Sequence, residues 1–265
     1  MKKIAFVLCI LLVGVSLGWA SGMKKKKLQP YEYGSVSINS FSQQAGMPPV
    51  LFDHWSHRQY ATCRLCHVDI GFGMTAGSTK IRAVDNMKGY YCGTCHNGKQ
   101  SAVFKKKVFE SCAKEYNRDE YKRCTICHVL ERSSAREDDF ERFAEKMPKD
   151  RLGNGINWEK AEAQGLVAPV DQLEGVSAVK QKLKVQPDFS LKAKVDGMPD
   201  IIFSHKKHTV WNGCEVCHPD IFVGIKKGAT KYSMVEIFEG KYCGVCHDKV
   251  AFPQSDCTRC HSKQP

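Results

Sequence analysis

The sequence repeats one short pattern of cysteine and histidine six times. In each copy two cysteines are separated by two residues and are followed at once by a histidine: Cys63-Cys66-His67, Cys92-Cys95-His96, Cys124-Cys127-His128, Cys214-Cys217-His218, Cys243-Cys246-His247 and Cys257-Cys260-His261. Two thiols one helical turn apart can each add to a vinyl group on one edge of a porphyrin. The histidine that follows then places an imidazole at the iron as its proximal ligand.

A single copy of this motif could instead belong to a zinc site or a thiol redox centre. Zinc does not require a histidine directly after every second cysteine, whereas all six copies have one. The sequence therefore predicts six covalently bound haem c groups, held by twelve cysteines and six proximal histidines.

Two of the 14 cysteines lie outside these motifs. Cys9 lies within an apolar run at the N-terminus, and no small residue precedes it as a lipid-anchor cysteine would require. Cys112 then has no internal partner. We expect Cys112 to be a buried free thiol, and a link to another molecule is the alternative.

Four of the ten histidines are not proximal, and they form two matched pairs, His54 with His57 and His205 with His208. Within each pair the spacing is three residues, so on one helical turn the two imidazoles share a face but lie at different heights along the axis. One short helix can therefore serve two separate irons. Because each pair ends six residues before a haem motif, we predict that all four histidines are axial ligands.

The two halves of the chain are copies of one unit, related by a shift of 151 residues. Besides the motifs, this shift superposes Met47-Pro48 on Met198-Pro199, Phe52 on Phe203, and Gly89, Tyr91 and Gly93 on Gly240, Tyr242 and Gly244. The third motif differs, since Cys124 and Cys257 are 133 residues apart. The first copy therefore contains 18 additional residues between its second and third motifs, and Cys112 lies among them.

The order of the motifs in each half resembles the triheme cytochrome c family, the three-haem relatives of the small tetrahaem class III cytochromes. The resemblance lies in FxHxxH, a first CxxCH, a glycine-rich stretch, GxYCGxCH and a final CxxCH, and it covers about residues 34–130 and 187–265. Leu191 to Lys194, ahead of Phe203, also resembles that family's opening hairpin. It implies low-spin haems with two axial ligands, a core of stacked haems and a role in electron transfer.

The resemblance also assigns the axial ligands. His54 would serve the haem on His67, and His57 the haem on His96. In the second half, His205 would serve the haem on His218, and His208 the haem on His247.

The haems on His128 and His261 are left without a second histidine, and a methionine thioether is the expected substitute. Such a ligand would raise their reduction potential above that of the bis-histidine haems. Because the family often places a ligand shortly before the second motif, we predict Met234 in the second half. In the first half Ala83 stands at that position, so Met87 is preferred and Met74 is the alternative. Methionine also fills cores, and without a ligand the haem on His128 would be five-coordinate.

Four segments make up the expected organisation of the chain. Residues 1–20 have the basic start, apolar run and small residues of a signal peptide, with cleavage after Ala20 or after Gly22. An uncleaved anchor is the alternative, although the run is short for a span of roughly 20 residues. We expect a first triheme module at 21–130, a helical linker or strap at 131–186, and a second triheme module at 187–265.

The strap contains two expected helices. Ser134 and Glu137 have the spacing of a capping box, and Phe140, Phe143 and Met147 then lie on one helical face up to Pro148. A second helix is expected at 158–164, closed by Gly165. With roughly 40 residues per haem, the fold class is mostly coil with short α-helices and small β-hairpins, in two class III-like triheme modules packed around the haems.

The net charge of +12 does not indicate a nucleic-acid partner. Two propionates give each haem a net negative charge, and six haems would offset most of this excess. We expect no nucleic-acid binding. Peripheral association with a membrane stays open.

We expect an exported electron-transfer protein, in the periplasm or at the cell surface, and not an enzyme. Its partners would be other cytochromes, a quinol-oxidising membrane complex or an outer-membrane conduit. One alternative is a multihaem reductase, which needs an open iron with acid–base residues over it. The other is a structural subunit of a self-assembling, conductive cytochrome complex.

Overall fold

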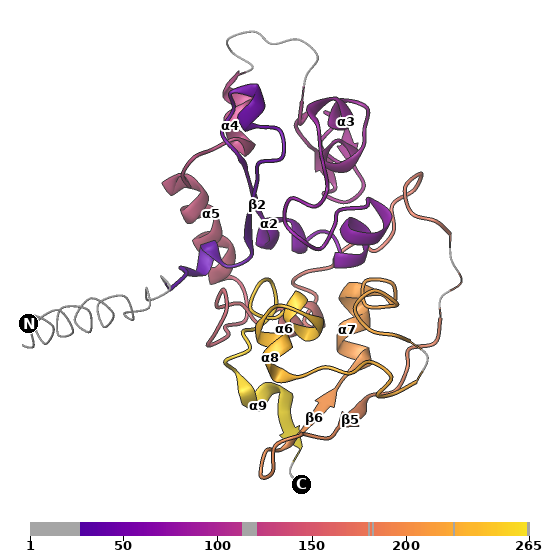
Figure 1. Ribbon diagram of the computed structural model, residues 1–265. Coiled ribbons are helices and arrows are strands. Elements are labelled where there is room, and N and C mark those ends of the chain that lie inside the picture. Colours follow the sequence, from indigo (N-terminus) through magenta and orange to yellow (C-terminus); the bar gives the residue numbers. More distant parts are fainter. Residues whose placement is uncertain (1–26, 113–120, 180, 182, 225, 264–265) are drawn as a thin grey trace, which may run out of the picture.

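The computed structural model describes residues 27–112, 121–179, 181, 183–224 and 226–263, so the expected signal peptide lies outside the described part. Most of this chain is turn and loop, with short helices and small antiparallel sheets (Figure 1), as the sequence predicts. None of the helices in the described ranges is long and apolar enough to cross a membrane. In the division predicted from the sequence, the described part of the first module is residues 27–112 and 121–130, that of the strap lies within 131–186, and that of the second module within 187–263.

The first module begins with a two-stranded antiparallel hairpin that leads directly into a short helix. Strand β1 (Ser35–Ile38) pairs with β2 (Val50–Asp53), and the residue after β2 starts α2 (His54–Arg58). The remaining elements are a π-helical turn (Leu65–Asp69), α3 (Ala83–Met87), a 3-10 helix (Tyr91–Thr94), the hairpin β3 (Gln100–Ser101) and β4 (Lys106–Lys107), and α4 (Tyr121–Cys127).

The second module repeats this order. Strand β5 (Phe189–Leu191) pairs with β6 (Asp200–Phe203), so the hairpin expected near Leu191 is confirmed. Helix α7 (His205–Asn212) follows, then α8 (Met234–Phe238), a 3-10 helix (Tyr242–Val245), α9 (Cys257–Cys260) and β7 (His261–Lys263). Strand β7 pairs with β6, and in the first module a bridge between Val50 and His128 takes the equivalent place.

The strap contains both expected helices, α5 (Ser134–Glu145) and α6 (Trp158–Ala163). Gly165 follows α6 in the left-handed conformation that favours glycine, with φ of 69°. The expected capping box at Ser134 is wrong. Ser134 is already helical, the extended residue before the helix is Ser133, and its side chain makes no capping hydrogen bond.

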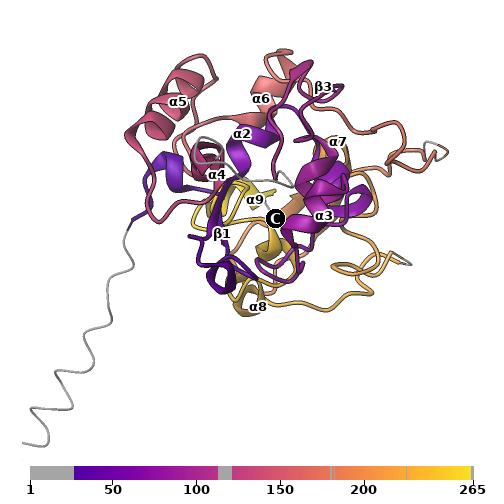
Figure 2. The same ribbon diagram turned by 90° about the horizontal axis from the view of Figure 1, so that it is seen from above.

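One apolar cluster joins the strap to both modules. It contains Trp55 from α2, Phe140 from α5, Trp158 and Ala161 from α6, and Trp211 from α7, with Phe143 and Met147 packed against it. The expected apolar face of α5 is therefore confirmed. Figure 1 places α4 at one end of the molecule and α9 at the other, and Figure 2, a view along that direction, projects both near the middle.

Candidate haem-binding sites

Three pairs of histidines face each other across a gap that suits one metal ion. The ring centres are 6.4 Å apart for His54 and His67, and the two ring planes differ by only 12°. They are 6.1 Å apart for His57 and His96, and 6.3 Å apart for His208 and His247. Because a bond from a metal to an imidazole nitrogen is about 2 Å long, imidazoles on opposite sides of one ion have centres roughly 6 Å apart.

The fourth expected pair is placed differently. Among the described side chains, the rings that contact His205 are those of Phe189 and Phe203, at 5.2 and 5.1 Å, and not that of His218. The structure thus brings together three of the pairs expected from the sequence, and the pairing of His205 with His218 stays a prediction.

In nine of the ten histidines, Nδ1 lies within hydrogen-bond distance of a backbone carbonyl. A carbonyl can only accept, so Nδ1 carries the proton, and neutral Nε2 is left to bind a metal. In the first module the acceptors belong to Gly34 for His54, Asp53 for His57, Phe72 for His67 and Pro48 for His128. In the second they belong to Pro187 for His205, Ser204 for His208, Phe222 for His218, Phe252 for His247 and Pro199 for His261.

The tenth histidine is His96. Its Nδ1 is buried and has no hydrogen-bond partner among the described residues. Its ring lies against Phe104 and Phe109 instead, with centres 5.8 and 4.6 Å away. Ring packing therefore orients the His96 imidazole, whereas a backbone carbonyl orients each of the other nine.

Burial keeps the paired imidazoles in the form that binds a metal. It is the main cause that lowers the pKa of His54 and of His57 from 6.5 to about 4. The same cause lowers the pKa of His67, His208 and His247. These side chains are neutral at pH 7, as iron ligation requires.

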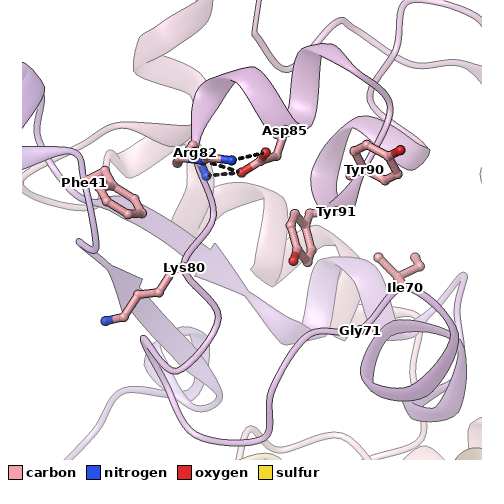
Figure 3. Close-up of a pocket in the computed structure, with 8 residues that line it drawn as sticks. All are labelled: Phe41, Ile70, Gly71, Lys80, Arg82, Asp85, Tyr90 and Tyr91. Atoms are coloured by element: carbon pink, nitrogen blue, oxygen red, sulfur yellow. Dashed lines mark hydrogen bonds and ion pairs between the residues drawn. The ribbon is translucent and has the colours of Figure 1, made fainter.

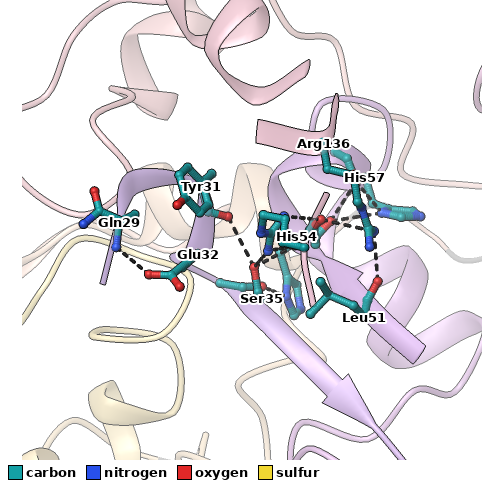
Figure 4. Close-up of polar contacts among 12 residues, drawn as sticks. Gln29, Tyr31, Glu32, Ser35, Leu51, His54, His57 and Arg136 are labelled. Carbon is teal, nitrogen blue, oxygen red and sulfur yellow. Dashed lines mark hydrogen bonds and ion pairs between the residues drawn. The ribbon is translucent and has the colours of Figure 1, made fainter. Parts of the chain in front are cut away.

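A buried ion cluster fixes α2 in the first module. The carboxylate of Asp53 accepts hydrogen bonds from Ser35 Oγ at 2.6 Å and from Arg132 at 2.6 and 2.8 Å. Arg136 lies 3.2 Å from the same carboxylate and donates to the Leu51 carbonyl (Figure 4). Burial alone would raise the pKa of Asp53, but the hydrogen bonds from Arg132 and Ser35 lower it below 3.8. Two arginines of the strap thus hold the residue that precedes His54.

The second module positions its histidine helix in another way. Ser204 stands where Asp53 does, and its Oγ accepts a hydrogen bond from the Lys207 amide, which caps α7. Helix α7 also continues for eight residues, to Asn212, whereas α2 has five.

The third histidine of each module is attached to the start of that module. His128 Nδ1 donates to the Pro48 carbonyl and His261 Nδ1 to the Pro199 carbonyl, both at 2.7 Å. Pro48 and Pro199 are equivalent in the repeat. The additional residues before the third motif of the first module therefore leave this attachment unchanged.

Cysteines of neighbouring motifs lie close enough to affect one another. Burial, and then Cys127 and Cys112, raise the pKa of Cys92 to about 12. Burial and then Cys63, Cys95 and Cys92 raise that of Cys66 to about 12. Burial and then Cys63 and Cys217 raise that of Cys246 to about 12. Burial and then Cys260 raise that of Cys243 to about 11. The motifs thus form a series in space. It begins at the third motif, passes through the second and first to the motifs of the second module, and ends at the sixth.

The second motif of each module depends on a close backbone approach. A Cβ on Gly93 would lie 1.9 Å from the Asn86 carbonyl oxygen, and one on Gly244 would lie 2.0 Å from that of Ile237. Both carbonyls belong to the helix that precedes the second motif, which is α3 in the first module and α8 in the second. The repeated glycine of GxYCGxCH is therefore required because no side chain fits there.

The expected methionine ligands and Cys112 lie in the following places. Met234 begins α8 and is 40% exposed, Met87 ends α3, and both Met87 and Met74 are half-buried. Cys112 is half-buried beside α3, where Asn86 Nδ2 donates to its Sγ at 3.8 Å. Burial raises the pKa of the Cys112 thiol, and Cys124 of the third motif contributes. That Cys112 is a free thiol stays a prediction.

A cavity of about 470 Å³ lies between the first and second motifs (Figure 3). It is lined by Phe41, Ile70, Gly71, Lys80, Arg82, Asp85, Tyr90 and Tyr91. Arg82 pairs with Asp85 at 3.1 Å, and Lys80 comes from the same segment of chain as Arg82, with Ile70 across from it in Figure 3. The lining thus combines three aromatic rings with two cations and one carboxylate.

The repeated motifs, the facing imidazoles and the carbonyl acceptors together fit haem c, and they define a multihaem c-type cytochrome. A family model described as "Cytochrome c7 and related cytochrome c" matches residues 50–129 and 201–262, more than half of the chain, which belongs to this family. The chain has the short helices and small antiparallel sheets of a cytochrome c7-like fold. Members of this class bind haem c and transfer electrons.

Three solved structures are similar to the chain. The C-terminal hexahaem fragment of GSU1996 is 22% identical, covers 86% of this chain and 96% of its own, and has a TM-score of 0.26. The N-terminal hexahaem fragment is 21% identical, with coverage of 87% and 99% and a TM-score of 0.24. The dodecahaem cytochrome c GSU1996 is 21% identical, with coverage of 89% and 75% and a TM-score of 0.26. No curated protein matches significantly.

Proposed function

We propose that the protein is an exported hexahaem cytochrome that relays electrons between redox proteins and does not act as an enzyme. The observation that carries the proposal is the set of facing histidine pairs, whose 6.1–6.4 Å separations leave room for one iron each. An iron held by two imidazoles accepts and returns an electron without binding a substrate.

The residues of the chain have three tasks in this function. Twelve cysteines hold the six haems covalently, and a histidine after each pair supplies the proximal nitrogen. His54, His57, His205 and His208 supply the opposite nitrogen, oriented by the carbonyls of Gly34, Asp53, Pro187 and Ser204. Met87 and Met234 complete the haems on His128 and His261. The modules are residues 21–130 and 187–265, joined by the strap at 131–186.

The series of neighbouring motifs supports a relay through the length of the molecule. It runs from the third motif near α4 to the sixth at α9, and Figure 1 places these at opposite ends. The partners that deliver and accept electrons would be other cytochromes, a quinol-oxidising complex or an outer-membrane conduit. Export to the periplasm or the cell surface would place the protein among them.

The test combines mass spectrometry with electron paramagnetic resonance of the oxidised protein. We expect the mass of six haems and six low-spin irons. Met234→Ala and Met87→Ala should each convert one iron to high spin, while Met198→Ala, at another exposed methionine, should convert none. A smaller mass would contradict the haem count, and a high-spin iron in the unchanged protein would contradict the methionine ligands and favour a small-molecule reductase.

A further inference from the structure

Arg58, the last residue of α2, lies where the two modules meet. Its guanidinium carbon is 4.7 Å from the ring centre of Trp158 in the strap and 4.6 Å from that of Trp211 in the second module. Its Nη1 donates to the Val250 carbonyl at 3.0 Å. Arg58 therefore joins the helix of His54 and His57 to the helix of His205 and His208, and to the loop after the fifth motif.

Among the residues that the structure describes, Arg58 has no ion-pair partner, and its buried Nε has no hydrogen-bond acceptor. Two aromatic faces and one carbonyl are what stabilise the charge. Burial lowers the pKa of Arg58, but a guanidinium is too basic to lose its proton in a protein. The junction thus contains a permanent positive charge.

The same side chain lies near two haem motifs of different modules. Arg58 is close enough to affect the pKa of Cys63 and His54 in the first module and of Cys246 in the second. Contact between the modules continues at Arg64, which follows Cys63, since a Cβ on Gly213 would lie 2.4 Å from Arg64 Cδ. Gly213 directly precedes Cys214. The first motif therefore borders the fourth and fifth motifs around Arg58.

We propose that Arg58 raises the reduction potentials of the haems on His67 and His247 and thereby stabilises the electron at the junction between the modules. A buried cation favours the ferrous state of a nearby iron, because that state carries one positive charge less. The inference rests on the proposed function, since it requires haems at the first and fifth motifs. The residue is specific to this junction, because Thr209 occupies the equivalent position in the second module.

The experiment is a potentiometric titration of the whole haem-loaded protein, followed by visible absorbance. Arg58→Met removes the charge and keeps an unbranched apolar side chain between the two tryptophans. We expect two of the six potentials to fall, by about tenfold in the reduction equilibrium constant, which is about 59 mV for a one-electron couple. Arg58→Lys, which keeps the charge, should restore most of the difference.

The controls separate charge from structure. Mass spectrometry should give the same haem content in every variant, and electron paramagnetic resonance should give the same low-spin irons. Arg142→Met removes the same charge from an exposed site on α5 and should leave all potentials unchanged. If Arg58→Met does not accumulate, Arg58→Gln removes the charge and keeps a donor for the Val250 carbonyl.

Failure of this inference and failure of the proposed function give different results. Unchanged potentials in a six-haem Arg58→Met or Arg58→Gln protein would overturn the role of Arg58 and leave the proposed function intact. Equal loss of potential in Arg58→Lys would also overturn it, because the charge is then not the cause. Fewer than six haems in the unchanged protein would instead contradict the proposed function.

Discussion

Helices α2 and α7 present the same pair of histidines but are held in place by different forces. In the first module, Asp53 is buried with Ser35, Arg132 and Arg136, so ion pairs from the strap fix the start of α2. In the second module, Ser204 caps α7 through one amide hydrogen bond. The repeat therefore preserves the ligands and their acceptors, while the support behind them has diverged.

The strap contacts each module at a different place. Arg132 and Arg136, directly after the first module, pair with Asp53 beside α2. In the second module, Arg259 of α9 pairs with Asp150 of the strap at 2.9 and 3.0 Å. We infer that the strap braces the histidine helix in the first module and the last motif in the second.

The largest expected difference between the modules comes from Asp53. Asp53→Asn removes the charge that balances Arg132, which is only 8% exposed, and leaves a buried cation unpaired. We expect the free energy of unfolding to fall by about 3–5 kcal/mol. Urea denaturation followed by circular dichroism measures this change. Asp139→Asn, at an exposed pair on α5, is the matched control and should leave the midpoint unchanged. Equal midpoints for both variants would contradict the brace.

Acid should loosen the first module over a defined range. Burial alone lowers the pKa of His54 and His57 to about 4, against 6.5 when unfolded, and iron ligation also requires the neutral form. Between these values the unfolded chain binds protons that the folded chain does not, so stability is complete above about pH 6.5 and falls as the pH is lowered toward 4. Between pH 7 and pH 5 the loss should be roughly 2 kcal/mol for each histidine.

Urea denaturation at pH 7 and at pH 5 measures this loss. The His57→Met variant places a ligand there that does not titrate, so its dependence on pH should be smaller by the share of one histidine. The same slope in the variant and in the unchanged protein would show that His57 is not the titrating group.

A third comparison should show no difference between the modules. Gly93→Ala and Gly244→Ala each force a methyl group against a helix carbonyl, at 1.9 and 2.0 Å. We expect each to cost about 1–3 kcal/mol, because the backbone must move to accept the added carbon. Thermal unfolding of the two variants checks this. A large effect in one module alone would mean that the second motifs are not equivalent.

The smallest expected effect is at Ser204. Ser204→Ala removes the cap of α7 and should destabilise the protein by about 1 kcal/mol. Ser204→Asp keeps an oxygen for the Lys207 amide and serves as the control. A loss as large as that at Asp53 would show that Ser204 has more than a capping role.

Local pattern predicted much of this fold. Motif spacing located the histidine helices, and the apolar positions of Phe140, Phe143 and Met147 located α5. The cap of α5 was placed one residue late, because neighbouring serines offer two starts and side-chain spacing does not choose between them. That choice depends on the backbone angles of Ser133.

Long-range contacts could not be predicted from such patterns. The Asp53–Arg132 pair joins residues 79 positions apart, and no local spacing in the sequence predicts it. The partners of the histidine Nδ1 atoms are backbone carbonyls, which every residue possesses. No sequence pattern singles out Arg58, since its two tryptophans come from other elements. Pattern thus identifies the groups that could bind haem, whereas the surroundings that tune them arise from the fold.

The hydrogen bond from the last histidine of each module to the proline just before β2 or β6 has a consequence for synthesis. Pro48 is made long before His128, and Pro199 long before His261, so neither third site can be completed until its whole module has emerged. Domains made first generally fold first. The first module, with Arg132 and Arg136 close behind it, can therefore close and be braced before the second is made. Adding a second copy of such a module therefore lengthens the protein without disrupting the contacts within the first copy.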